Sequence, residues 1–206
     1  VHLTDTADNL GDAAADTGSA EEAIIVAASS IAVSTAANIA QLTAIDADAS
    51  LTAGSTLVYS VADVAAAIAT DVDTAGADFS GSATSVVVTT AATASLATVI
   101  NGMTTVPTIA IDDTYAEIYN LSGGVRTLTD AMLDAASTVT LTDTMSNIDT
   151  NATAITADAS VDTVVIEDFL GNLATSGASD ITADALAAAD SVTITYTGTA
   201  GTTAIS

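Results

Sequence analysis

The strongest constraint on the fold of this chain is a short motif that recurs along it: an apolar residue, one intervening residue, and a second apolar residue. Eight copies follow one another in steps of 23 to 30 residues. Such a period indicates a repeat architecture, in which each unit buries its apolar face against its neighbours. Taken by the second apolar residue, the copies are centred on Leu3, Val33, Val61, Val88, Ile111, Leu141, Ile166 and Ile194.

The clearest copy runs from 139 to 148 and predicts a strand followed by a turn. Val139 and Leu141 alternate with threonines, which is the period-2 pattern of a half-buried strand. Asp143 should end this strand, and Asn147 should lie in the turn, because asparagine bonds its own backbone there. The equivalent asparagines, for which we also expect turns, are Asn9, Asn38 and Asn172.

The rest of each repeat is expected to return as a short helix or a loop. Ranges 19–26, 127–136 and 182–189 each combine a Ser or Thr cap with early acidic residues and several alanines, which favours a helix. Range 71–85 contains Gly76 and Gly81 and is expected to be a loop or a longer turn.

Strands that are separated by a crossover of this length should pair in parallel. We therefore predict a right-handed parallel β-solenoid of about eight rungs, with short helices or loops on one side. A leucine-rich-repeat horseshoe fits less well, because Asn147 lies six residues after Leu141 rather than three. Residues 1–206 are expected to form a single repeat array, which looks like a segment of a longer protein.

Charge limits the partners of the chain. It has 26 acidic residues against one basic residue, Arg126, for a net charge of −25. With a single arginine and no lysine it cannot neutralise phosphates, so nucleic acids and anionic membrane surfaces are excluded as partners. Cations are the natural partners. No apolar run approaches the length of a membrane span, so membrane insertion is not expected.

Three aspartates occupy one repeat position on consecutive predicted strands: Asp113, Asp143 and Asp168. In register they would lie roughly 5 Å apart, and carboxylates at that spacing repel one another. Ca²⁺ prefers such oxygen ligands and would relieve the repulsion. Asp112 and Glu167 lie beside them, so these five residues are the predicted metal ligands. The alternative is that they are solvated turn residues.

The residues give no support for an enzyme. His2 is the only histidine and lies at the start of the first strand, so no Ser/His/Asp constellation can be built around it. Paired carboxylates remain formally able to act as acid and base, but the chain has one arginine and only 3% aromatic residues to hold a sugar beside them.

Ranges 139–148 and 181–189 resemble the Ala/Thr/Asp-rich repeats of giant bacterial cell-surface proteins, such as adhesins, surface-layer proteins and extracellular matrix filaments. The resemblance lies in composition and rhythm and extends over most of the chain. It implies an extracellular or cell-surface location. The calcium-binding nonapeptide of toxin repeats is absent, because Gly123-Gly124 is followed by a sequence that does not match it.

The functional expectation is a non-enzymatic structural protein of the bacterial exterior that assembles into a filament or surface layer, with divalent cations relieving its charge. Unpaired strand edges at the two ends would favour head-to-tail contacts between copies. The alternative is an adhesin stalk or binding module that presents loops such as 71–85 or 121–126 to a carbohydrate or protein ligand.

Overall fold

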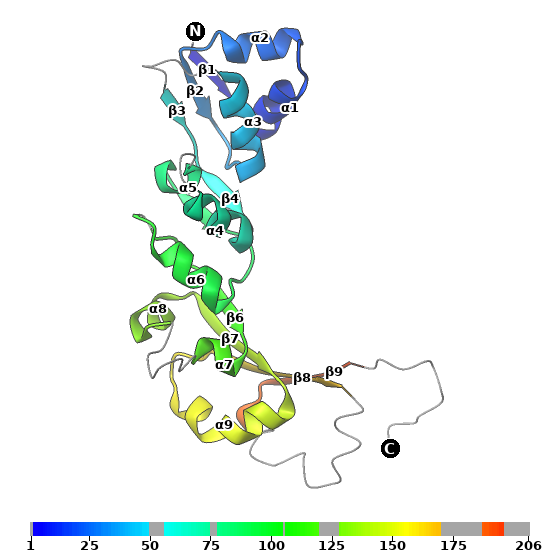
Figure 1. Ribbon diagram of the computed structural model, residues 1–206, viewed down its shortest axis with the longest axis vertical. Coiled ribbons are helices and arrows are strands. Elements are labelled where there is room, and N and C mark those ends of the chain that lie inside the picture. Colours follow the sequence, from blue (N-terminus) through cyan, green and yellow to red (C-terminus); the bar gives the residue numbers. More distant parts are fainter. Residues whose placement is uncertain are drawn as a thin grey trace, which may run out of the picture. The chain divides into compact units, whose positions relative to one another are not determined.

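The chain is a mixed α/β protein (Figure 1). The computed structural model describes residues 2–49, 56–74, 78–104, 106–119, 128–169 and 187–195. The chain divides into two compact units, Val1–Ile109 and Ala110–Ser206.

The first unit contains two small parallel sheets. Strands β1, β2 and β3 pair in that order, and β4 pairs with β5. In Figure 1, helices α1, α2 and α3 are grouped beside the three-stranded sheet. The elements are β1 (His2–Asp5), α1 (Ala7–Ala15), α2 (Ala20–Val26), β2 (Ser30–Val33), α3 (Ile39–Ala49), β3 (Thr56–Val58), β4 (Val61–Asp63), α4 (Ala65–Asp73), α5 (Phe79–Ser82), β5 (Val86–Val88) and α6 (Ala94–Asn101).

The second unit contains one four-stranded parallel sheet in the order β6-β7-β8-β9. Helix α9 is its longest described helix. The elements are β6 (Ala110–Asp113), α7 (Tyr115–Ile118), α8 (Asp130–Ala135), β7 (Thr138–Asp143), α9 (Met145–Ala157), β8 (Thr163–Phe169) and β9 (Ser191–Thr195).

The predicted β-solenoid is wrong, although its strands are present. All eight motif centres lie within strands, and every described strand pair is parallel, as predicted. The strands nevertheless form three separate sheets of three, two and four strands, and no stack of eight rungs is seen in the described ranges. Helices fill much of the sequence between strands, so the architecture is mixed α/β.

Neighbouring strands are staggered by two residues relative to the sequence motif. Leu3 pairs with Ile31 rather than with the next centre, Val33. The same offset places Ile111 opposite Val139 and Leu141 opposite Val164. Because side chains alternate with a period of two, this even shift keeps the apolar residues of each motif on the same face of the sheet.

Four of the described helices, α1, α4, α7 and α9, begin directly after a strand, earlier than predicted. The Thr144 hydroxyl accepts a hydrogen bond from the Asn147 amide and caps α9 in this way. Thr6 caps α1 through the amide of Asn9 in the same manner. Asn9 and Asn147 therefore lie in first helical turns, and the prediction that they occupy turns between strands is wrong. Asn38 instead forms a reciprocal cap with Gln41 before α3, and Asn172 lies outside the described residues.

The other helix predictions have mixed outcomes. Range 19–26 is helical as α2, and its Ser19 cap is confirmed. Range 127–136 contains the shorter helix α8, with Thr129 as its cap. Range 71–85, predicted to be a loop or a longer turn, contains the end of α4 and helix α5. Most of 182–189 lies outside the described residues.

The core of each unit is built from aliphatic residues of the strands and the adjoining helices. In the first unit Ile31 and Val61 are buried together with helical residues such as Leu42 and Ile68. In the second unit the buried residues include Ile111, Val139, Leu141, Ile148 and Ile166. Burial of these side chains supplies the main driving force for folding.

Candidate functional site

The strand-end aspartates hold together consecutive strand–helix segments. One oxygen of Asp143, Oδ1, accepts hydrogen bonds from the Thr144 amide (2.7 Å) and from the Asn147 side chain (2.7 Å). The other oxygen, Oδ2, accepts from the Tyr115 amide (3.1 Å) at the start of α7, the helix that follows the preceding strand. Asp143 thus joins its own helix cap to a helix 28 residues earlier in the chain.

The same arrangement recurs at other strand ends. Asp63 Oδ1 accepts from the Val64 amide (2.7 Å), and its Oδ2 accepts from the Ile39 amide (2.9 Å) at the start of α3. Asp168 Oδ2 accepts from the Met145 amide (3.2 Å). At two junctions a threonine replaces the aspartate: Thr35 Oγ1 accepts from the Ala7 amide, and Thr90 Oγ1 accepts from the Ala65 amide.

This arrangement supplies hydrogen-bond acceptors to the first backbone amides of the helices. The first amides of a helix have no partner within the helix, and the helix dipole favours negative charge there. A carboxylate from the next strand supplies both the acceptor and the charge. We call this contact the interstrand cap, and its acceptors include Thr35, Asp63, Thr90, Asp143 and Asp168.

The five predicted metal ligands do not form the in-register ladder that the sequence suggested. The two-residue stagger places Asp113 opposite Leu141, Asp143 opposite Ile166 and Asp168 opposite Ile194. Asp143 and Asp168 are almost fully buried, with 7% and 6% of their surface exposed, and both bind backbone amides.

The flanking acids Asp112 and Glu167 directly precede Asp113 on β6 and Asp168 on β8. Asp112 Oδ1 accepts from the Thr142 hydroxyl (2.8 Å), and Glu167 pairs in register with Thr193. Within the described ranges, no group of three or more His or acidic side chains is arranged to hold a metal ion.

Asp5 stands at the equivalent position on the first strand. Its Oδ1 accepts from the Asn9 side chain (2.7 Å) and the Thr6 amide (2.8 Å), and these bonds, the Asn9 bond first, lower the pKa of Asp5 below its ordinary value of 3.8. Because the charged form is favoured on folding, its contribution to stability is present above pH 3.8 and is lost as the pH falls through the lowered pKa.

We expect the substitution Asn9→Ala to raise the pKa of Asp5 toward 3.8, because it removes the larger cause of the shift. The measurement is an NMR titration of the Asp5 carboxyl carbon in both proteins. Asn147→Ala, which removes the same bond from Asp143 in the other unit, is the control and should leave the Asp5 titration unchanged. An equal Asp5 pKa in Asn9→Ala and the unmodified chain would contradict the assignment.

A second polar cluster positions α5 in the first unit. The buried carboxylate of Asp71 accepts from the amides of Phe79 (3.3 Å) and Ser80 (2.7 Å), and the Tyr59 hydroxyl donates to the Phe79 carbonyl (3.0 Å). Burial raises the pKa of Tyr59, and the nearby charge of Asp71 raises it further. These contacts hold helix ends together. Among the described residues, the Ser80 hydroxyl has no hydrogen-bond partner, although it is buried.

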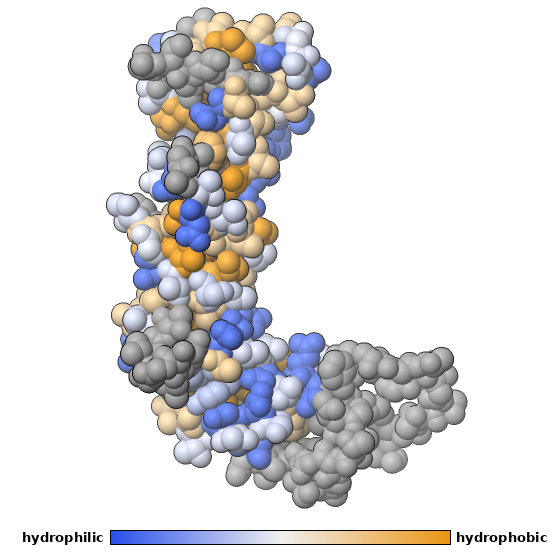
Figure 2. Space-filling model, viewed as in Figure 1, coloured by the Kyte–Doolittle hydropathy of each residue, from blue (hydrophilic) through white to orange (hydrophobic). Residues whose placement is uncertain are grey.

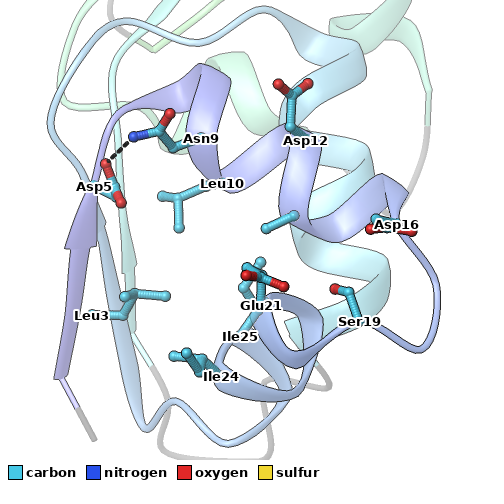
Figure 3. Close-up of a pocket in the computed structure, with 11 residues that line it drawn as sticks. Leu3, Asp5, Asn9, Leu10, Asp12, Asp16, Ser19, Glu21, Ile24 and Ile25 are labelled. Atoms are coloured by element: carbon cyan, nitrogen blue, oxygen red, sulfur yellow. Dashed lines mark hydrogen bonds between the residues drawn. The ribbon is translucent and has the colours of Figure 1, made fainter.

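A pocket of about 440 Å³ lies between β1, α1 and α2. In Figure 3, Leu3, Leu10 and Ile25 surround the hollow, and Ile24 lies beside them. Its rim is acidic, with Asp5, Asp12, Asp16 and Glu21. An apolar floor with an acidic rim and no basic residue suits an apolar segment of protein better than an anionic small molecule.

A shallower hollow in the second unit is lined by Tyr119, Asp130, Asp134, Asp158 and Ser160, among others. The Tyr119 hydroxyl donates to Asp158 Oδ2 (2.8 Å), and the Tyr119 ring stacks on Tyr115 with 4.4 Å between ring centroids. Asp158 also accepts from the amide of Ser160 (3.0 Å). These bonds organise the end of α9.

His2 is exposed on β1 and its ring hydrogen-bonds the Ser30 hydroxyl on the neighbouring strand. Of the two loops predicted to present a ligand site, 121–126 lies outside the described residues and 71–85 contains α5.

Comparison of the chain with protein-family profiles, with curated proteins and with solved structures finds no match. Among the described helices, none has the length and apolar character needed to cross a membrane.

Proposed function

We propose that the chain is a non-enzymatic structural protein of the bacterial exterior that assembles with copies of itself into a filament or surface layer. The observation that carries this proposal is the recurrent interstrand cap. The most buried acidic side chains at the strand ends, Asp143 and Asp168, bind backbone amides, which is a structural use of residues that an enzyme would employ as acid or base.

The charge of the chain supports an assembly that depends on cations. With a net charge of −25, copies repel one another unless salt or bound cations reduce the field between them. On the face shown in Figure 2, apolar residues occur in small groups separated by hydrophilic ones. Divalent cations, with Ca²⁺ the first candidate, would bridge the exposed carboxylates within and between copies.

We expect Ca²⁺ to raise the melting temperature of the chain more than NaCl at equal ionic strength, because a cation that binds the folded state stabilises it by mass action. At a concentration of about 100 times the Kd the gain would be about 2.7 kcal/mol. The measurement is thermal unfolding followed by circular dichroism in Ca²⁺, in Mg²⁺, in NaCl alone and after addition of chelator.

The double variant Asp112→Asn/Glu167→Gln should lose part of the Ca²⁺ effect if these flanking acids contribute to a site. The matched control is Glu117→Gln/Asp134→Asn, which removes the same charge from two exposed acids of the same unit. Equal stabilisation by Ca²⁺ and NaCl in the unmodified chain would contradict the calcium proposal and leave the structural role in place.

A further inference from the structure

One face of the sheets in the first unit lies in solvent. Successive side chains of a strand point to opposite faces, and Ile31, Tyr59 and Val61 are buried on the inner side. The residues that alternate with them point outward, and among these Val58 and Val87 are 47% and 54% exposed. We call this surface the outer face; its residues in β2, β3, β4 and β5 and in the link between β3 and β4 are Ser30, Ala32, Thr56, Val58, Ser60, Ala62 and Val87.

The strand pairing makes the outer face continuous. Ala32 pairs in register with Val58, and Ala62 pairs with Val87. Only residues 59 and 60 separate β3 from β4, and the bridge between Ala37 and Val61 continues the pairing along this stretch. The outer face is therefore one surface of small and β-branched side chains.

The outer face carries no acidic side chain, although the chain has 26 acidic residues. The acid within β2 to β5 is Asp63, which alternates with Ala62 and whose carboxylate binds two backbone amides. In the second unit the corresponding sheet face carries Asp112 and Glu167, and both are exposed. Negative charge is thus excluded from the outer face of the first unit and present on its counterpart.

This distribution of charge limits what can bind the outer face. Two copies with a net charge of −25 repel each other, and the repulsion is weakest where neither copy presents a carboxylate. A cationic partner would be attracted to the carboxylates elsewhere on the chain. Sheets with apolar or neutral faces pack face to face at about 10 Å, so an uncharged sheet face suits a second face of the same kind.

From these observations we propose that the outer face of the first unit packs against the outer face of a second copy of the chain. In this contact Val58 and Val87 lose their exposure to solvent. A surface that binds itself closes after two copies, so the contact joins filaments or layers side by side and does not extend them. This inference rests on the proposed function and specifies one of its contacts.

The contact is expected to be weak in isolation. The outer face has seven residues in these strands, whereas stable interfaces contain about 20–30 residues on each side. Many such contacts acting together in an assembly would hold copies firmly. The association of single chains therefore has to be measured over a concentration series, in about 1 M NaCl, where the Debye length falls to about 3 Å.

The test places a charge on the outer face of the full chain. We expect sedimentation velocity to show a reversible dimer of the unmodified chain, and Val58→Glu and Val87→Glu should each weaken dimerisation at least about tenfold, because like charges then meet across the contact. The matched control is Val26→Glu on α2, where the valine is 48% exposed and lies off the outer face. It should dimerise as the unmodified chain does. Circular dichroism verifies that each variant folds.

A charge-swap mixture tests whether the outer face binds itself. Val87→Lys mixed with an equal amount of Val87→Glu should dimerise more strongly than Val87→Glu alone, because opposite charges then face each other. The same mixture made at position 26 measures general attraction between the two charges and should show no such gain. An equal gain at both positions would show that the outer face does not bind its own copy.

The outcomes separate this contact from the proposed function. If Val58→Glu and Val87→Glu dimerise as strongly as Val26→Glu, the outer face is not the contact and self-assembly stands. If the unmodified chain is monomeric in NaCl but assembles with Ca²⁺, the outer-face contact is wrong and self-assembly again stands. If the chain stays monomeric under both conditions, both proposals are wrong.

Discussion

The Asp143→Ala variant should unfold with a free energy lowered by about 2–4 kcal/mol, since a hydrogen bond to a charged group contributes about 1.5–3 kcal/mol and loss of a helix cap costs about 0.5–2 kcal/mol. The substitution removes the acceptor of three donors: the Tyr115 amide, the Thr144 amide and the Asn147 side chain. Urea denaturation followed by circular dichroism measures the change as a lower midpoint.

Asp134→Ala is the matched control for this variant. Asp134 is exposed on α8, and its removal relieves the same unit of negative charge. In a chain of net charge −25 that relief is favourable in both variants, so the difference between them isolates the interstrand cap. Asp143→Asn keeps one carbonyl oxygen, so its urea midpoint should fall between those of Asp143→Ala and Asp134→Ala. Equal midpoints for Asp143→Ala and Asp134→Ala would show that the cap contributes nothing to stability.

The second large effect is expected in the core of the four-stranded sheet. Leu141 is fully buried at the centre of β7, between β6 and β8. Leu141→Ala should lower the free energy of unfolding by about 2–5 kcal/mol, because it removes buried apolar surface and leaves a cavity. The same urea measurement applies, at a protein concentration low enough to keep the chain monomeric.

Two valines at the same motif position provide the control for this prediction. Val139→Ala removes a side chain that is 1% exposed, and Val192→Ala removes one that is 43% exposed on the edge strand. Val139→Ala should lower the free energy of unfolding clearly more than Val192→Ala, because the loss grows with the apolar area that folding removes from water. Equal costs would contradict the burial of β7 described above.

The strands were predictable because their signal is local. Val139 and Leu141 alternate with threonines, and this period-2 pattern located all eight centres within strands. The parallel direction followed from the distance between motifs. The predicted solenoid is wrong because helices start where the pattern predicts the ends of strands. Thr144 stands directly before α9 and caps it by accepting a hydrogen bond from the Asn147 amide.

The roles of the strand-end acids could not be derived from one copy of the motif. The spacing of Asp113, Asp143 and Asp168 predicted carboxylates side by side, but that holds only if centres pair with centres. The observed register is shifted by two residues, and nothing in a single strand encodes that shift. Thr35 and Thr90 stand at the same repeat position as these aspartates and accept the same kind of hydrogen bond. Their presence indicates that this position serves as a hydrogen-bond acceptor, for which a neutral side chain suffices.

The interstrand cap also gives the chain a direction in which folding must be completed. Each capped helix receives its acceptor from a strand that lies 23 to 28 residues further along the sequence. During synthesis a helix would therefore leave the ribosome before the residue that completes its first turn. For the same reason, the effect of a truncation should depend on which side of a cap is removed. Removing the segment before the acceptor leaves an Asp or Thr oxygen that water can satisfy, whereas removing the segment after the helix leaves a helix amide without its acceptor.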